Sequence, residues 1–308
     1  MATYLITQAT GQQSQWVIRH LLAAGCKVHA VVRDLQKELP PTLHSPGVTL
    51  FQGESKNSEE IFKAAQGCKG AFLNTFPIPG LEAQQAQAIV EACKKAGVET
   101  IVAATTQGTS DKAMWNDAET KECGMLEYYL SKAAVEDIVR RADFRAYTIL
   151  RPAFIHFDYL LPNAWYNYPR LPSHGELDHA CNENARIPQT DGHDIGKYAS
   201  AALLDPAKFG GQEIDMGNET PNIEEIRAVL AKVSGRDVRA RKRTPEEEEE
   251  AKTSLWAQRF HLFANVKDFG IIPGHAKEVQ TKFGIPFTSL ENALQRDKAA
   301  LLECLPAN

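Results

Sequence analysis

Short apolar segments alternate with amphipathic segments along the first half of the chain, and this alternation constrains the fold more than any other feature. The apolar segments, each long enough for one β-strand, are residues 4–7, 27–32, 48–52, 70–75, 100–105 and 145–152. Most are separated by stretches of helical periodicity, at 13–24, 59–66, 81–96 and 125–141. Such alternation is typical of right-handed βαβ units, so the sequence predicts a doubly wound parallel sheet with helices on both faces.

The second half of the chain differs in its composition and in its periodicity. Residues 154–175 are rich in proline and aromatic side chains and show no clean periodicity. Further on, the pattern predicts a helix at 194–206, a strand at 211–217 and a helix at 222–236. We therefore expect an α/β domain over 1–152 and a smaller α+β lobe over 153–308, with residues 186–218 returning to the first domain.

The acidic run at 244–252 predicts the start of an exposed helix. Thr244 is the candidate N-cap, Pro245 fits the first helical position, and the glutamates that follow favour the positive end of the helix dipole. An interaction tail is the less favoured interpretation of such a run.

The overall charge and the cysteines restrict the class of partner. A net charge of −5 gives no electrostatic footprint for nucleic acid, and no apolar run reaches the length of a membrane span. The six cysteines are scattered and the N-terminus has no signal-sequence pattern, which indicates reduced thiols in a cytoplasmic protein. We expect a small-molecule ligand and neither nucleic acid nor a membrane as partner. The oligomeric state stays open.

The turn after the first strand is the expected ligand site, because ligands of doubly wound sheets bind where the winding reverses. A dinucleotide-binding turn carries three spaced glycines, and here these positions hold Gln8, Gly11 and Ser14. Gly11 opens the helix whose amides would face phosphates, and Ser14 is small enough for close packing. Gln8 is the main departure from the motif.

The end of the second strand indicates which dinucleotide would fit. Arg33 stands there, with Lys37 nearby, whereas Asp34 is one residue late for binding a ribose 2′-hydroxyl. An arginine suits the 2′-phosphate of NADP, so the sequence favours NADP(H) over NAD(H). The alternative is that Arg33 is simply a solvated loop cation.

Tyr128 and Lys132 lie four residues apart in the segment LEYYLSKAAVEDIVRR, so they share one helix face. A lysine beside a tyrosine lowers the pKa of the phenol and makes it a better proton donor or acceptor. The lysine can also hold the hydroxyls of a nicotinamide ribose. The position of this pair, after the fifth strand of a nucleotide-binding pattern, favours a catalytic role.

The aromatic stretch supplies a candidate substrate pocket for a bulky, flat, partly cationic molecule. Its candidate residues are Phe154, His156, Phe157, Asp158, Tyr159 and Trp165. An extended backbone would point His156 and Asp158 to one face, where they would add acid–base capacity. The alternative is an aromatic lobe core containing a structural His–Asp pair.

The segment SHGELDHACNE at 173–183 contains His174, His179 and Cys181, but their spacing fits no compact zinc pattern. We expect a surface loop there and no metal.

Seven segments of the sequence, taken together and in order, resemble NmrA-like proteins, which are atypical members of the short-chain dehydrogenase/reductase superfamily. They are ITQATGQQSQWVIRHLL, VHAVVRD, GAFLNTFP, IVEACKKAGVETIVAATT, LSKAAVEDIVR, YTILRPAFI and TDGHDIGKYASAALLDP. TKFGIPFTSLENAL extends the resemblance toward the end of the chain. The resemblance implies a Rossmann domain with a smaller C-terminal lobe and binding of NADP(H) or NAD(H).

The resemblance also assigns roles to individual positions. Thr10, Gly11, Gln12 and Gln13 would line the pyrophosphate, and Arg33 the 2′-phosphate. Thr75, Phe76 and Pro77 would pass under the adenosine and ribose, Lys132 would hold the nicotinamide ribose, and Pro152, Ala153 and Phe154 would border the nicotinamide. Thr105 or Thr106 would add a hydroxyl at the end of the fifth strand.

Members of this family differ in function. Some resemble NADPH sensors and transcriptional co-regulators, in which the tyrosine is often absent, and others are reductases, many of which modify natural products. Tyr128 and Lys132 favour a reductase that delivers hydride from NADPH to a ketone, enone or iminium carbon, with Tyr128 supplying the proton. The alternatives are a non-catalytic NADP(H) sensor and a natural-product cyclase whose cofactor is vestigial or serves a coupled reduction.

Overall fold

The computed structural model describes residues 1–307, with the backbone alone for Thr253. The chain divides into two compact units. The first unit consists of Met1–Ser110, Glu127–Arg151 and Gly192–Asp215. The second consists of Asp111–Leu126, Pro152–Asp191 and the chain from Met216 onward.

The first unit is built on a seven-stranded sheet in the order β10-β6-β5-β4-β1-β2-β3, and every pair of neighbouring strands is parallel. The strands are β1 (Thr3–Ile6), β2 (Lys27–Val32), β3 (Val48–Gln52), β4 (Gly70–Leu73), β5 (Thr100–Ala104), β6 (Ala146–Arg151) and β10 (Gln212–Asp215). The predicted doubly wound parallel sheet is therefore confirmed. The winding reverses at β1, which has β2 on one side and β4 on the other.

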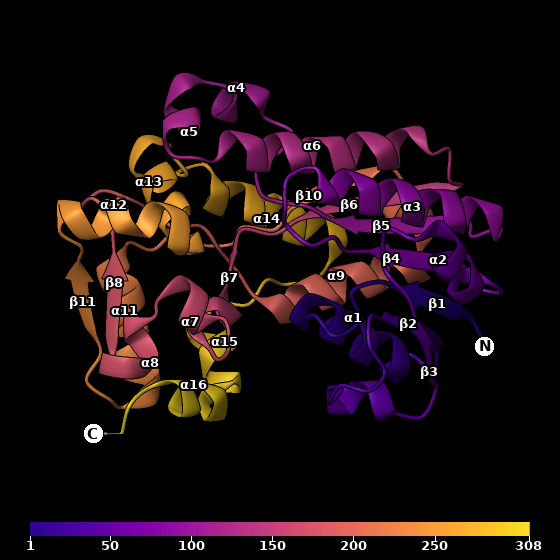
Figure 1. The fold of residues 1–308 in the computed structure, drawn as a ribbon, viewed down its shortest axis with the longest axis horizontal. Helices are drawn as coiled ribbons and strands as arrows, with labels where there is room; N and C mark the ends of the chain where they lie inside the picture. The colour runs from indigo at the N-terminus through magenta and orange to yellow at the C-terminus, as the bar shows by residue number, and fades with distance from the viewer. Residues whose placement is uncertain (308) are drawn as a thin grey trace. The chain divides into compact units, whose positions relative to one another are not determined.

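Helices cover both faces of this sheet (Figure 1). On one face lie α2 (Ser58–Ala65), α3 (Leu81–Lys95) and α6 (Leu126–Arg141), and on the other α1 (Gln12–Ala23) and α9 (Gly192–Leu204). Two short helices, η1 (Pro41–His44) and α10 (Pro206–Phe209), complete the unit. Within the segment predicted to return to the first domain, residues 192–215 supply α9, α10 and the edge strand β10, whereas residues 186–191 and 216–218 belong to the second unit.

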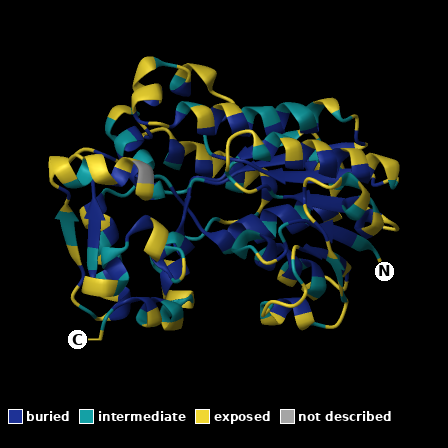
Figure 2. Cartoon of the chain, viewed as in Figure 1, coloured by how far each residue is buried: buried dark blue, intermediate teal, exposed yellow. Residues whose placement is uncertain are grey.

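Alternating residues of the central strands fill the two cores, as a period of two requires. Leu5 and Ile101 point to the side of α2, α3 and α6, where they pack with Ile61, Ile89 and Val135, all fully buried. Tyr4 points to the opposite side, and its hydroxyl donates to the carbonyl of Leu203 on α9 (3.3 Å). The central strands are accordingly buried along their length (Figure 2).

Helices α1 and α9 pack closely because Gly196 has no side chain. A Cβ atom at Gly196 would lie 2.7 Å from Cβ of Trp16 and 2.8 Å from its carbonyl carbon. Neither atom belongs to a flexible side-chain end, so no larger residue fits without moving α1. The position of α1, whose N-terminus follows β1, therefore depends on this contact.

The second unit is mixed α+β. Its strands form two short parallel pairs, β7 (Phe154–Ile155) with β9 (Gln189–Thr190) and β8 (Glu176–His179) with β11 (Arg239–Lys242). Its helices are α4 (Lys112–Trp115), α5 (Ala118–Glu122), η2 (His156–Tyr159), α7 (Ala164–Asn167), α8 (Arg170–His174), α11 (Ile223–Ser234), α12 (Pro245–Ser254), α13 (Trp256–Val266), α14 (Ile272–Phe283), α15 (Leu290–Arg296) and α16 (Lys298–Cys304).

Polar side chains cap several helices of this unit, and one of these caps was predicted from the sequence. Thr244 caps α12 in a capping box with Glu247, and Pro245 is its first residue, so the predicted helix start is confirmed. Asp111 and Asp117 cap α4 and α5 by accepting from the amides of Met114 and Thr120. These two helices were not predicted, because each is too short to show a periodicity.

Two expectations about this unit are wrong. Residues 156–159 form the 3₁₀ turn η2 rather than an extended strand, since this turn brings both ring nitrogens of His156 to carboxylates while Tyr159 enters the core. The predicted surface loop at 173–183 contains strand β8, and Asp178, His179 and Cys181 are buried. Burial there is stabilised by an ion pair between Asp178 and Arg243 (2.6 Å). None of the helices in residues 1–307 is both long enough and apolar enough to cross a membrane.

Candidate cofactor and proton-transfer site

The turn between β1 and α1 presents the open N-terminus of α1. Gly11 precedes the helix in an extended conformation, no side chain caps the helix, and its first turn contains no acidic residue. The first amides of α1 are thus available to an anion, and the helix dipole favours one there. The Gly11 amide donates to the Gln8 carbonyl (2.8 Å), and a Cβ at Gly11 would lie 3.1 Å from that oxygen. A side chain at this position would crowd the Gln8 carbonyl, so glycine suits this tight turn.

The two positions that depart from the glycine motif are accommodated in different ways. Gln8 adopts the left-handed backbone conformation (φ 51°) that glycine favours, and its side-chain amide donates to the Ser55 hydroxyl (3.3 Å). Ser14 is fully buried, and its hydroxyl donates to the carbonyl of Thr7 at the end of β1 (2.9 Å). The turn therefore keeps its conformation without the two glycines.

Arg33 is exposed where β2 ends. Within residues 1–307 its guanidinium makes no hydrogen bond or ion pair, whereas the carboxylate of Asp34 accepts from the backbone amide of Gln36 (2.9 Å). The carboxylate of Asp34 is thus engaged by a hydrogen bond within its own loop, whereas the guanidinium of Arg33 has no partner among residues 1–307. This is the arrangement that suits a phosphate better than a ribose hydroxyl.

The loop after β4 is joined to the turn after β1 by a hydrogen bond from the Asn74 amide to the Thr7 hydroxyl (3.0 Å). Phe76 is half exposed, and its amide donates to the side chain of Gln85 on α3 (2.9 Å). Pro77 is partly buried. The hydroxyl of Thr75 points inward and donates to Glu82 (2.8 Å).

Tyr128 and Lys132 lie on the same face of α6, as their spacing predicts. The ammonium of Lys132 lies 5.3 Å from the centroid of the Tyr128 ring and 2.7 Å from a carboxylate oxygen of Glu82. Burial by itself lowers the pKa of Lys132, but the interactions with Tyr128 and Glu82 outweigh it and raise that pKa above its ordinary value. Lys132 is therefore a buried ammonium with a raised pKa beside a phenol.

Thr105 and Thr106, the candidate hydroxyls after β5, are both buried. The Thr105 hydroxyl donates to Glu136 (2.7 Å), whose carboxylate also receives two hydrogen bonds of 2.8 Å from Arg151. Arg151 ends β6 and also pairs with Glu213 of β10. Glu136 follows Lys132 by one helical turn, so this network fixes α6 against the carboxyl ends of β5 and β6 and against the edge strand β10.

The aromatic residues of the second unit divide between core and surface. Tyr159 and Tyr168 are fully buried and stacked, with ring centroids 5.4 Å apart, and Phe154 packs against both. Phe157 is also buried, whereas Trp165 is half exposed. The amide of Ala153, which follows the buried Pro152, donates to Thr190 (2.8 Å).

His156 is buried between two carboxylates, with Nδ1 3.1 Å from Asp191 and Nε2 2.8 Å from Asp297. Arg296 pairs with both aspartates. Asp158 accepts a hydrogen bond from Asn163 (3.1 Å), and burial raises the pKa of its carboxyl to about 6. His156 thus belongs to a cluster of charged side chains, and the raised pKa of Asp158 allows that carboxyl to exchange a proton near neutral pH.

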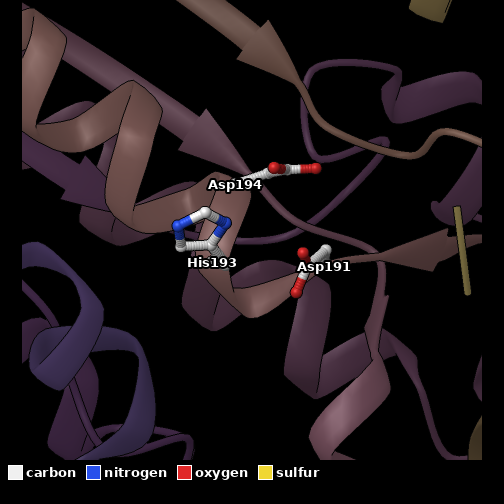
Figure 3. Close-up of side chains that lie close together, drawn as sticks. All are labelled: Asp191, His193 and Asp194. Atoms are coloured by element: carbon white, nitrogen blue, oxygen red, sulfur yellow. The ribbon is translucent and has the colours of Figure 1, made fainter. Parts of the chain in front are cut away.

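Figure 3 shows the side chains of Asp191, His193 and Asp194. Asp191 is paired with Arg296 (2.6 Å), and Asp194 is paired with Lys197 within α9 (2.9 Å). Both carboxylates already have cationic partners that would repel a metal ion. We assign no metal to this group.

Sequence reasoning missed Glu82, Glu136 and Arg151, which are buried charged residues around the candidate site. The signal that could have found Glu136 is its spacing, since Tyr128, Lys132, Glu136 and Arg140 repeat every four residues along α6. Glu82 has no such signal, because its partner lies 50 residues away along the chain.

The strand order and the open turn after β1 define the class of Rossmann-type α/β proteins. The model of the NmrA-like family matches residues 2–290, and the chain belongs to that family.

Three similar proteins illustrate its relatives. The nitrogen metabolite repression protein nmrA of Emericella nidulans is 25% identical over 241 residues, which are 77% of this chain and 66% of nmrA. The NmrA-like oxidoreductase ptmS of Penicillium ochrochloron is 24% identical over 256 residues, covering 75% of this chain and 72% of ptmS. The crystal structure of the NADPH-dependent quinone oxidoreductase QOR2 of Escherichia coli, complexed with NADPH, superposes with a TM-score of 0.73 and 20% identity over 96% of this chain and 99% of QOR2.

Proposed function

We propose that the protein is an NADP(H)-dependent oxidoreductase, and the observation that carries this proposal is the pair Tyr128–Lys132. A buried ammonium that stays charged lies 5.3 Å from the ring centroid of a phenol on the same helix face. A proton donor beside a fixed positive charge is useful for catalysis and is unnecessary for binding alone. The names of ptmS and QOR2, both oxidoreductases, support the same class of activity.

The residues of the first unit fit a dinucleotide phosphate. The open N-terminus of α1 and the turn of Thr10, Gly11, Gln12 and Gln13 would receive the pyrophosphate. Arg33, free of partners within residues 1–307, would receive the 2′-phosphate. Thr75, Phe76 and Pro77 would pass along the adenosine and ribose, and Lys132 would hold the nicotinamide ribose. When bound, NADPH supplies a hydride.

The substrate we propose is a ketone, enone or iminium compound with a bulky aromatic or alkaloid-like body, of the kind met in natural-product modification. Tyr128 would donate the proton that a carbonyl oxygen needs, with the charge of Lys132 stabilising the phenolate that remains. The exposed ring of Trp165 and the ionisable carboxyl of Asp158 support a substrate role for the second unit. Pro152, Ala153 and Phe154 stay predictions from the resemblance. A cytoplasmic location stays a prediction from the scattered cysteines and the N-terminal sequence.

A second candidate function is supported by nmrA, whose name is that of a repression protein. As a sensor the chain would bind NADP(H) and present it to a protein partner without turnover. The cyclase alternative stays a prediction that no observation here favours.

The test combines calorimetry with turnover assays. We expect NADPH to bind with micromolar affinity and Arg33→Ala to weaken it about 10–100-fold, because a charge-assisted phosphate contact is lost, while NADH binding is unchanged. Arg141→Ala is the matched control, since Arg141 is exposed at the other end of α6, before β6 begins. Tyr128→Phe should keep NADPH binding and lose turnover of carbonyl substrates at least about 100-fold, and lose less with iminium substrates, because hydride addition to an iminium carbon needs no proton.

The alternatives give different results. NADPH binding without turnover of any such substrate would support the sensor. Cyclisation that persists without NADPH would support the cyclase. Failure of NADPH, NADP+, NADH and NAD+ all to bind would overturn the proposed cofactor.

A further inference from the structure

Glu82 lies in the first turn of α3 and has no solvent exposure. One carboxylate oxygen, Oε1, accepts hydrogen bonds from the ammonium of Lys132 (2.7 Å) and the hydroxyl of Thr75 (2.8 Å). The other, Oε2, is buried and accepts no hydrogen bond from any residue between 1 and 307. Three segments, the loop after β4, the start of α3 and the middle of α6, therefore meet at one carboxylate.

This arrangement contributes little to the stability of the folded protein. A buried ion pair loses the hydration of both charges. The attraction between the charges offsets that loss only when the remaining polar atoms of the pair are hydrogen-bonded. Here an entire carboxylate oxygen is left without a donor, so an apolar pair of similar volume would stabilise the same contact as well. The ion pair is better explained by the effect of Glu82 on the position and the protonation of Lys132.

Charged and titratable groups reach Lys132 from two helices. Glu82 approaches from α3, while Tyr128 and Glu136 lie one turn before and one turn after it on α6. Burial favours a neutral amine, and these neighbours together reverse that preference. Glu82 forms a direct hydrogen bond to the ammonium.

We propose that Glu82 is a positioning residue of the active site: it fixes the ammonium of Lys132 on the face of α6 that carries Tyr128 and keeps it protonated, and Thr75 orients Glu82 for this task. The proposal rests on the proposed function, because it assigns a role around the same Tyr128–Lys132 pair. It also gives Thr75 a role separate from contact with the cofactor.

The first test is Glu82→Gln, which keeps the shape and an oxygen acceptor but removes the negative charge. We expect the variant to fold and bind NADPH within about tenfold of wild type, with kcat reduced about 10–100-fold. The alkaline limb of the pH profile of kcat should move to lower pH, because Lys132 then loses its proton more easily. A merely structural role would lower the amount of folded enzyme without moving this limb.

Glu59→Gln is the matched control. Glu59 forms an ion pair with Lys95 (2.8 Å) in the same unit, but both side chains are more than half exposed. The same chemical change there should leave kcat and its pH profile unaltered. Thr75→Val gives a second variant that keeps the charge pair and removes the hydroxyl that orients it, and it should move the alkaline limb in the same direction by less.

A readout without turnover separates this proposal from the proposed function. In lysine-labelled protein, the ¹³Cε resonance of Lys132, assigned with Lys132→Arg, should titrate at lower pH in Glu82→Gln than in wild type, with or without NADPH. An unchanged titration in folded Glu82→Gln and Thr75→Val would overturn the role of Glu82. Wild type that shows the expected titration but neither binds NADPH nor turns over substrate would overturn the proposed function and leave the effect of Glu82 on Lys132 intact.

Discussion

The hydroxyl of Ser14 donates a hydrogen bond of 2.9 Å to the carbonyl of Thr7, joining the first turn of α1 to the end of β1. A glycine at this position of a dinucleotide-binding turn serves to let helix and strand approach closely. Here a small side chain makes the same approach and bonds across it. In this turn, the hydrogen bond of Ser14 replaces the conformational freedom that a glycine would have.

Removing this contact should destabilise the protein. Ser14→Ala keeps the size of the side chain but loses the buried hydrogen bond, so we expect the free energy of unfolding to fall by about 1 kcal/mol. Ser14→Gly should lose about 1 kcal/mol more, because glycine is the poorer helix former. Urea unfolding at neutral pH measures both. A stability of Ser14→Ala equal to wild type would show that the hydroxyl contributes nothing.

Replacing Gln8 by glycine should have the opposite effect. Gln8 adopts a φ of 51°, which is unfavourable for a residue with a Cβ atom. We expect Gln8→Gly to raise the free energy of unfolding by about 0.5–1 kcal/mol, the relief of strain being partly offset by the greater freedom of glycine in the unfolded chain. Gln8→Ala is the control, since it also loses the contact with Ser55 but keeps the strain. Equal stabilities of the two variants would contradict the explanation.

The ion pair of Asp178 and Arg243 should be strongly sensitive to the loss of one partner. Both side chains are almost fully buried and lie 2.6 Å apart. Arg243→Met leaves an uncompensated carboxylate in the interior, so we expect a loss of about 3–5 kcal/mol. Adding Asp178→Asn should recover part of this loss, because the buried charge is removed. Thermal unfolding of the single and double variants tests this, and a double variant no more stable than Arg243→Met would refute it.

The stability of the second unit should decline in mild acid because of His179. Burial, with Arg243 and Lys242 nearby, lowers the pKa of His179 to about 4, and its Nδ1 accepts a hydrogen bond from the amide of Cys181 (3.1 Å). The unfolded chain binds a proton at this residue below about pH 6.5, whereas the folded chain does not until about pH 4. Stability is therefore lost as the pH falls between these values, by up to about 3 kcal/mol.

His179→Asn isolates this contribution, because an amide oxygen can accept from Cys181 and does not titrate. Urea unfolding of wild type and variant at pH 7 and pH 4.5 should show wild type losing more stability in acid than the variant. Parallel losses in the two proteins would assign the acid sensitivity to other groups.

The sequence by itself determined the local structure and the sheet. Alternation of strands and helices specified the parallel sheet, since period and segment length are properties of neighbouring residues. The spacing of Tyr128 and Lys132 specified a shared helix face, and Thr244 with Pro245 specified a helix start. Each of these features involves residues within one helical turn or one strand.

Only the tertiary structure decided how charges are paired inside the protein. Glu82 meets Lys132 across 50 residues and Asp178 meets Arg243 across 65, and no periodicity connects such positions. Strand β8 was not predictable for the same reason, because its segment contains ionisable residues that are typical of a surface loop until a distant arginine neutralises one of them. Burial of a charge depends on a partner supplied by the folded chain, and a local pattern carries no information about that partner.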